Sequence, residues 1–184
     1  FVTMRYFIAI DLPDDIKTEL IRIQDILTQH FEGNLVQPEN LHITLKFLGS
    51  IDEDTFEKTH TILSSISHDI FNVSLQKIGV FSKKDIKTAW VGVSEIPLQQ
   101  VLDSALKPLY EPDNRFIGHI TLARIKKINH KKRFLELIAA TQVKHKECKV
   151  TEYCLKESIT YAQGPVYHTK GVYRLLQGRV ELKS

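Results

Sequence analysis

The tetrapeptide His-Ile-Thr-Leu occurs twice in this chain of 184 residues, at positions 42–45 and 119–122. Both copies stand in apolar stretches with the composition of β-strands, in which successive side chains point to opposite faces. In each copy the histidine and the threonine therefore share one face, and the isoleucine and the leucine share the other. A strand anchored by its apolar face thus presents an imidazole beside a hydroxyl. Two such strands brought together would place two histidines and two threonines around one cleft.

Either copy alone is typical of a structural strand, because a short motif often matches without function. The surroundings repeat as well, since each copy follows one amphipathic helical pattern, precedes another, and is followed by a basic residue, Lys46 or Arg124. A repeated context of this kind favours duplication and a shared functional site. Apolar spacing predicts helices over 16–27, 56–66, 98–109 and 134–138, and strands over 5–11, 41–48, 71–75, 88–93 and 116–124.

The order of helix, motif strand, helix and further strands occurs twice, which predicts an α+β protein with a bilobal, duplicated fold. We expect two mainly antiparallel sheets flanking a central cleft, with helices on the outer faces. Residues 4–184 are predicted to form a single bilobal domain, and residues 1–3 are expected to be cloning-derived or an upstream extension. Gly33-Asn34 is predicted to end the first helical element, and residues 145–180 to form strands interrupted at Gly164-Pro165 and at Gly171.

Composition narrows the function classes. The formal net charge of +3 does not by itself mark a nucleic-acid-binding protein. A basic segment over 126–133 is predicted to be a solvated helix start, with an RNA backbone contact as the alternative. Cys148 and Cys154 match no zinc spacing, so free thiols in a reducing compartment are expected. No apolar run approaches membrane-spanning length, and a cytoplasmic protein with no membrane partner, acting as a monomer, is expected.

Longer stretches around both copies resemble a known family. The resemblance is to the two-histidine phosphoesterases, and within them to the LigT-like RNA 2′,3′-cyclic phosphodiesterases, also called 2′-5′ RNA ligases. It extends over nearly the whole chain from Met4 and implies a bilobal duplicated α+β fold with a central cleft. The segments that carry it are 5–10 (RYFIAI), 39–49 (ENLHITLKFLG), 118–124 (GHITLAR), 158–160 (SIT) and 164–167 (GPVY).

The resemblance implies opening of a 2′,3′-cyclic phosphate at an RNA end to leave a 2′-phosphate. By match to the first motif, His42 would be the proton donor, and by match to the second, His119 would be the proton acceptor. Thr44 and Thr121 would bind phosphate oxygens. The match over 164–167 adds Tyr167 as a substrate contact.

The residues support this chemistry independently. Hydrolysis of a cyclic phosphodiester needs a base for water, an acid for the leaving ribose oxygen and donors for the phosphate charge, and histidine suits both proton transfers. Lys46 shares a face with Thr44 by strict alternation and is predicted to contact phosphate. Arg124 lies three residues beyond Thr121, so it reaches the phosphate only if the strand bulges. The other histidines show no ligand spacing, so no metal or cofactor is expected.

Three alternatives stay open at this point. A 2′-5′ RNA ligase would run the reverse reaction, with a 5′-hydroxyl, for example of a tRNA half, in place of water. A non-catalytic module would only bind RNA ends. A phosphodiesterase for small nucleotides would act on a cyclic nucleotide phosphate or a 2′,5′-oligoadenylate. The chain contains no P-loop, so it offers no support for an ATP-driven mechanism.

Overall fold

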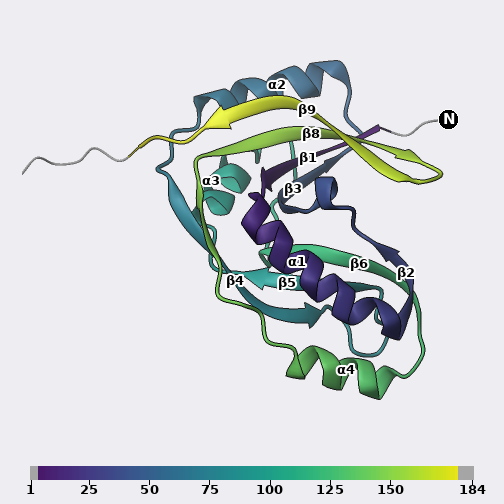
Figure 1. Ribbon diagram of the computed structural model, residues 1–184. Helices are drawn as coiled ribbons and strands as arrows, with labels where there is room; N and C mark the ends of the chain where they lie inside the picture. The colour runs from purple at the N-terminus through teal and green to yellow at the C-terminus, as the bar shows by residue number, and fades with distance from the viewer. Residues whose placement is uncertain (1–3, 178–184) are drawn as a thin grey trace, which may run out of the picture.

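The computed structural model describes residues 4–177 and shows helices packed around a strongly curled sheet (Figure 1). The strands are β1 (Met4–Asp11), β2 (Phe31–Leu35), β3 (His42–Gly49), β4 (Phe71–Val80), β5 (Thr88–Val93), β6 (His119–Ile128), β7 (Glu147–Val150), β8 (Glu152–Tyr161) and β9 (Gly164–Arg174). The helices are α1 (Asp14–Leu27), α2 (Glu53–Ser65), α3 (Pro97–Ala105) and α4 (Lys131–Ala140), with single 3-10 turns at Thr28–His30 and Pro38–Asn40.

The strands follow the order β7-β4-β5-β6-β3-β1-β8-β9, and β2 pairs with β6 from the side. The pairs within this order are antiparallel, so the α+β class and the antiparallel pairing are confirmed. The two motif strands, β3 and β6, meet at the centre, where only Ile43 and Ile120 are register partners. The two half-sheets are therefore continuous through this one contact and splay apart on either side of it, as the upper and lower halves of Figure 1 show.

Helices α1, α2 and α3 begin where the sequence offers a helix start, and all four helices bury apolar side chains. Helix α1 follows Pro13 and carries Asp14 and Asp15 in its first turn, where the helix dipole favours acidic groups. Helix α2 is capped by Asp52, whose carboxylate accepts a hydrogen bond from the Thr55 amide at 2.8 Å. Helices α1 and α4 pack against the half-sheet containing β4 and β6, and α2 and α3 pack against the other half.

The core lies between these helices and the sheet. It includes the apolar partners of both repeated motifs, which are at most 1% exposed: Ile43, Leu45, Ile120 and Leu122. Burial of four such side chains stabilises the fold by roughly 2 kcal/mol each, and it fixes which face of each motif strand stays open. Among residues 4–177, no helix has the length and apolar character needed to cross a membrane.

Two local predictions about glycines were wrong. Gly33-Asn34 does not end a helix but lies inside β2, and Gly171 does not interrupt β9. A side chain at Gly33 would sit 2.2 Å from the Arg124 carbonyl oxygen, so this glycine permits the close approach of β2 to β6. Residues 178–180, also predicted as strand, lie outside the described residues.

Candidate active site

A cavity of about 1510 Å³ opens on the face of the sheet opposite the core, and both motif strands line it. Its walls include His42 and Thr44 from β3, and His119 and Thr121 from β6. Because Ile43 and Ile120 are antiparallel partners, His42 lies across from Thr121, and Thr44 lies across from His119. The structure thus brings together the four side chains that the sequence predicted, as two imidazole–hydroxyl pairs related by the duplication.

Backbone hydrogen bonds fix the orientation of both imidazoles. His42 Nδ1 lies 2.7 Å from the Asn40 carbonyl oxygen, and His119 Nδ1 lies 2.7 Å from the Ile117 carbonyl oxygen. A carbonyl only accepts, so each Nδ1 must donate, and each Nε2 is left for the cavity. His42 Nε2 lies 2.8 Å from Thr44 Oγ1, so in the neutral imidazole the threonine hydroxyl donates to it. The two carbonyls, each two residues before its histidine, set the same tautomer in both halves.

Aromatic rings surround each histidine. Phe7 and Tyr167 lie against His42, with ring centroids 5.0 and 5.4 Å away. Phe81 and Trp90 lie against His119 at 5.0 and 5.8 Å. Tyr167, which is expected to contact substrate, lines the cavity, and its role as a substrate contact stays a prediction. Phe81 also lines the cavity but was not identified from the sequence, because it lies in the loop after β4, far along the chain from either motif.

Burial lowers the pKa of His42 from 6.5 to about 4. The hydrogen bond to the Asn40 carbonyl and the charge of Asp11 act in the opposite direction, and the nearby Lys156 ammonium adds to the lowering. Lys156 is itself paired with Asp11 through a 2.5 Å contact, and Asp11 is the register partner of His42 across β1 and β3. In the free protein His42 is therefore neutral at pH 7.

A bulge in each motif strand decides which later residues reach the cavity. In β3, Ile8 pairs with Lys46 and Ala9 pairs with Thr44, so Leu45 is an extra residue. In β6, Ala89 pairs with Ala123 and Trp90 pairs with Thr121, so Leu122 is the extra residue. A bulge puts two successive side chains on one face, and the alternation then resumes shifted by one position.

The bulge removes Lys46 from the cavity, so the prediction that it contacts phosphate does not fit the structure. Its side chain is 5% exposed and points to the helix side, where Nζ lies 2.6 Å from Asp103 Oδ1 and 2.8 Å from the Glu111 carbonyl oxygen. Asp103 and Asp113 line a separate cavity of about 640 Å³. Lys46 therefore ties β3 to α3 and to the following loop. Phe47 takes its place on the cavity wall and is 73% exposed.

The matching bulge in β6 brings Arg124 to the cavity wall, which meets the condition that the sequence analysis set for a phosphate contact by this residue. Its Nη1 lies 3.5 Å from Thr88 Oγ1, which leaves most of the guanidinium donors free toward the cavity. Phe47 and Arg124 hold equivalent positions in the duplication. Because β3 and β6 are antiparallel, these two residues lie at opposite ends of the cavity. One end is therefore aromatic and the other cationic.

A buried glutamine supports each bulge from the helix side. Gln24 of α1 is 3% exposed, and its Nε2 donates to the carbonyl oxygens of Leu122 at 2.9 Å and of Val36 at 2.8 Å. Gln99 of α3 is 4% exposed and donates to the Leu45 carbonyl oxygen through a longer contact of 3.5 Å. The Leu122 carbonyl also accepts from the Val36 amide at 2.8 Å, so the Gln24 amide adds a second hydrogen bond to it, and the Gln99 amide contacts the equivalent carbonyl of Leu45.

Within residues 4–177, no group of three or more His, Cys, Asp or Glu side chains is arranged to hold a metal ion. Cys148 and Cys154 are free thiols outside the cavity. The side chains described above provide the cavity with imidazoles, hydroxyls, the Arg124 guanidinium and aromatic rings. This set can bind an anionic phosphate and transfer protons to and from it.

Comparisons with known proteins place the chain among phosphoesterases. The family model described as LigT-like phosphoesterase matches residues 10–90 and 96–167. The chain is 31% identical to an RNA 2′,3′-cyclic phosphodiesterase from Methanothermobacter thermautotrophicus, over 94% of this chain and 99% of that protein. It is 33% identical to the protein of the same name from Methanocaldococcus jannaschii, over 89% and 96% of the two chains. The crystal structure of Escherichia coli LigT complexed with 3′-AMP superposes with a TM-score of 0.73 at 25% identity, covering 96% of this chain and all of that one.

Proposed function

The chain belongs to the family of LigT-like phosphoesterases, and we propose that it hydrolyses 2′,3′-cyclic phosphates at RNA ends to 2′-phosphomonoesters without a metal. The observation that carries the proposal is the pair of equivalent imidazole–hydroxyl sets on one cavity, in each of which Nδ1 is bound to a backbone carbonyl and Nε2 remains for proton transfer. Relatives named RNA 2′,3′-cyclic phosphodiesterase, similar over most of the chain, support the substrate class.

In the proposed reaction, His119 Nε2 accepts a proton from water as the water oxygen attacks phosphorus. The bond from phosphorus to the ribose 3′ oxygen breaks, and His42 Nε2 donates a proton to that oxygen. The hydroxyls of Thr44 and Thr121 and the guanidinium of Arg124 hold the non-bridging oxygens, on which charge develops. The two imidazoles exchange protonation states, so a second proton exchange with solvent restores the site.

This assignment of acid and base follows the family resemblance and requires His42 to be protonated when substrate is bound. A phosphate anion near Nε2 raises the pKa of an imidazole, which works in this direction. One observation favours the reverse assignment: burial lowers the pKa of His42 to about 4, so the free protein offers a neutral imidazole that suits a base. The two assignments predict different responses to a better leaving group.

The first experiment measures turnover of a 2′,3′-cyclic nucleotide in EDTA by the wild type and by His42→Ala and His119→Ala. Each substitution is expected to abolish most turnover, because each removes one proton transfer, and general acid–base catalysis contributes about 10²- to 10⁴-fold per group. His145→Ala removes an exposed histidine outside the cavity and serves as the matched control. Near-wild-type turnover by either motif variant would refute the two-histidine mechanism.

A substrate with sulfur in place of the 3′ bridging oxygen then separates acid from base. A thiolate leaves without protonation, so the variant that lacks the acid regains turnover, whereas the variant that lacks the base does not. Under our assignment, His42→Ala is rescued and His119→Ala is not. Rescue of His119→Ala alone would establish the reverse assignment.

The same site supports a 2′-5′ ligation, in which a 5′-hydroxyl of a second RNA, such as a tRNA half, replaces water at the cyclic phosphate. The proposed main direction is hydrolysis, since water at its bulk concentration competes with any RNA hydroxyl. Both motifs come from one chain, which supports a monomer as the active unit. Adding a 5′-hydroxyl oligonucleotide to the assay and probing for a joined product tests the ligation.

A further inference from the structure

We propose that the RNA strand upstream of the reacting phosphate lies along a basic surface at the Arg124 end of the cavity. This inference rests on the proposed action at RNA ends. The basic surface combines the end of β6, the start of α4 and the loop between β4 and β5. Its cations are Lys83, Lys84, Lys87, Arg124, Lys126, Lys127, Lys131, Lys132 and Arg133.

The charge of the protein is concentrated in these segments. Residues 81–87 and 124–133 hold nine basic residues and one acidic residue, a net charge of +8. The whole chain carries only +3, so the remaining residues together carry −5. A uniform solvated surface would not divide the charge this way, whereas an anionic polymer bound at one end of a cavity accounts for it.

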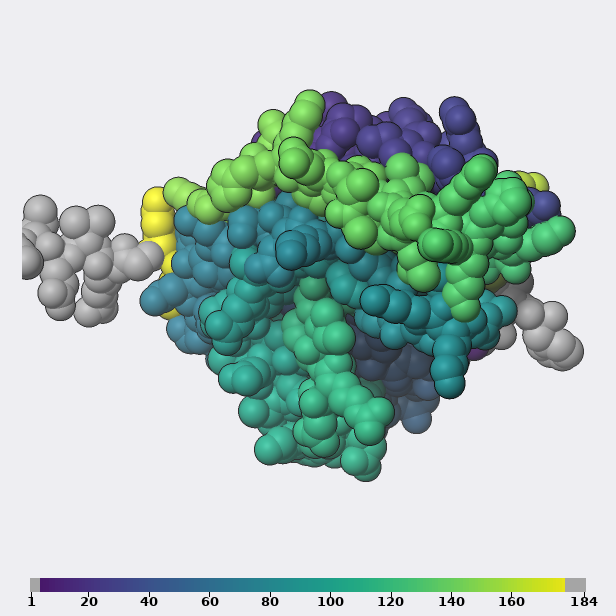
Figure 2. Space-filling view, turned by 90° about the horizontal axis from the view of Figure 1, so that it is seen from below, coloured from purple at the N-terminus to yellow at the C-terminus, as the bar shows by residue number. Residues whose placement is uncertain are grey.

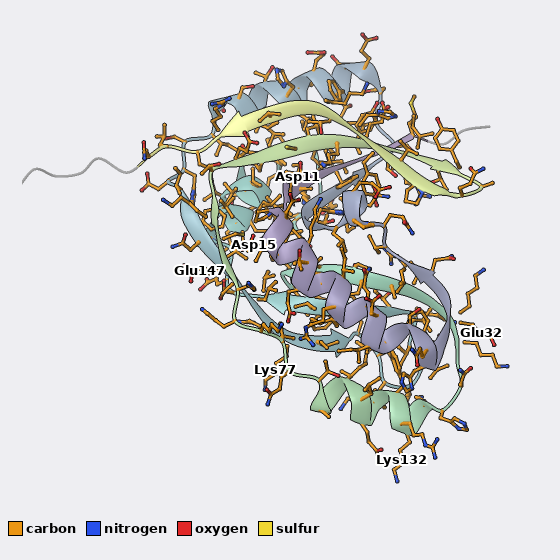
Figure 3. All side chains as sticks on the ribbon, viewed as in Figure 1. Asp11, Asp15, Glu32, Lys77, Lys132 and Glu147 are labelled. Atoms are coloured by element: carbon orange, nitrogen blue, oxygen red, sulfur yellow. The ribbon has the colours of Figure 1, made fainter. Side chains whose placement is uncertain are left out.

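The fold assembles these segments into one surface. The Ile125 amide donates to the Lys87 carbonyl oxygen at 2.8 Å, and Lys131 Nζ donates to the Lys84 carbonyl oxygen at 2.6 Å. The loop between β4 and β5 therefore lies against both β6 and the start of α4, and Figure 2 shows these teal and green segments side by side on the face seen from below. The Lys132 side chain projects away from α4 (Figure 3).

The basic surface continues directly from the cavity. The cavity wall reaches Gly33 of β2, whose register partner is Ile125. The next two residues of β6, Lys126 and Lys127, form a further bulge, because Glu32 pairs with Lys127 while Gly33 pairs with Ile125. Both lysines are exposed and Ile125 is buried, so both lie on the same face of the strand as Arg124. Lys127 is six residues beyond Thr121, roughly 20 Å at the rise of a β-strand.

The opposite end of the cavity lacks this charge. Beyond Phe47, β3 ends at Gly49, and among residues 4–177 the cavity lining at that end contains one arginine and no lysine, the arginine being Arg5. The acidic residues near the basic surface include Asp85, which pairs with Lys87 at 3.2 Å, Glu32, which is the neighbour of Lys127 across β2 and β6, and the exposed Glu136 of α4. Among the described residues, Lys126, Lys127, Lys132 and Arg133 form no salt bridge. Their charge is therefore available to phosphates.

The basic residues at the start of helix α4 lower the stability of that helix. Helices α1 and α2 carry acidic residues in the first turn, but α4 begins with Lys131, Lys132 and Arg133 and has no acidic residue there. Cations at a helix N-terminus oppose the helix dipole by about 0.3–1 kcal/mol each. A bound phosphate would offset this repulsion, and a residue choice that weakens its own helix points to a role beyond folding.

The test compares two substrates and two matched triple variants. Lys84→Gln, Lys126→Gln and Lys127→Gln together remove three charges of the basic surface. Lys77→Gln, Lys144→Gln and Lys149→Gln remove three exposed charges elsewhere and serve as the control. Each protein is assayed with a cyclic mononucleotide and with a single-stranded RNA of about ten nucleotides that ends in a 2′,3′-cyclic phosphate. Binding of the 2′-phosphate product RNA is measured from 50 to 300 mM salt.

The basic-surface variant is expected to turn over the mononucleotide at the wild-type rate but to bind RNA about 10- to 50-fold more weakly near 150 mM salt. Its plot of log affinity against log salt should lose about 0.7 in slope per lost phosphate contact, or about 2 in all. The control variant should match the wild type in every assay. If the triple variant proves unstable, Lys126→Gln and Lys127→Gln alone should each lose about 0.7 in slope.

An unchanged salt slope in the basic-surface variants would overturn the inference. An equal loss for mononucleotide and RNA, or an equal effect of the control variant, would overturn it too. Failure of the proposed function looks different: the wild type would turn over neither substrate. In that case, RNA binding that still depends on the basic surface would keep this inference and leave the protein as an RNA-end-binding module.

Discussion

Replacing Lys46 by methionine tests whether the bulge in β3 assigns this lysine to the fold and not to the phosphate. The ammonium group lies 2.6 Å from Asp103 Oδ1, and the side chains are 5% and 13% exposed. Removing one partner of a buried ion pair costs about 3–5 kcal/mol, because the other charge stays desolvated. Asp103 still accepts hydrogen bonds from the Asp113 amide at 3.1 Å and retains some exposure, so we expect the lower end, about 3 kcal/mol.

Urea denaturation and steady-state kinetics on the same preparation provide the assay. With a slope near 2 kcal/mol per molar urea, a loss of about 3 kcal/mol shifts the midpoint by about 1.5 M. The value of kcat/KM for a cyclic nucleotide should stay within about threefold, since Lys46 faces away from the cavity. Adding Asp103→Asn should restore part of the stability by removing the unpaired charge. A Lys46→Met protein of wild-type stability with kcat/KM reduced tenfold or more would refute the placement.

Further predictions concern the cavity itself. Thr44→Ala and Thr121→Ala should each reduce kcat about 10²- to 10³-fold with little change in the unfolding midpoint, as for the loss of one oxyanion donor. Arg124→Met should lower kcat/KM without destabilising the protein, the reverse of Lys46→Met, and equal effects of the two would contradict the bulges. An NMR titration should give His42 a pKa of about 4 in the free protein, and Lys156→Met should raise it. Because the unfolded chain binds that proton below pH 6.5 and folded His42 does not, stability should fall as the pH drops from 6.5 toward 4.

The sequence predicted the core of the site because duplication and alternation are both short-range patterns. A period of two fixes that His42 and Thr44 share a face, and the repeat says that His119 and Thr121 do the same. The helices could also be predicted from the sequence, since α1 and α2 each carry apolar residues at helical spacing and acidic residues in the first turn. These features depend on neighbouring residues and not on the tertiary fold.

Lys46 and Arg124 show where that reasoning stops. Strict alternation predicted that Lys46 faces the cavity and that Arg124 reaches it only if its strand bulges. A bulge in each strand turns Lys46 away from the cavity and brings Arg124 to it. A bulge is set by pairing with the neighbouring strand and by the buried amides of Gln24 and Gln99, which come from distant segments. Gly33 was misinterpreted for a similar reason: what it permits is contact with Arg124, 91 positions away in the sequence.

The exposed aromatic wall at Phe47 follows from the same shift. Phe47 is 73% exposed on the cavity wall because the bulge at Leu45 turns it, and not Lys46, toward the cavity. Phe81 was missed because its approach to His119 depends on the turn between β4 and β5. In both cases the position of a cavity residue depends on tertiary structure, so it could not be predicted from neighbouring residues.

The most direct test of the central claim is to identify the product that the protein forms from an RNA oligonucleotide ending in a 2′,3′-cyclic phosphate. The reaction is run with and without EDTA, and the product is identified by ³¹P NMR and mass spectrometry. Our account predicts a gain of one water and a 2′-phosphate end, formed by the wild type and lost in His42→Ala and His119→Ala. A 3′-phosphate end, turnover that EDTA abolishes, or no hydrolysis of a substrate that is bound would each contradict it.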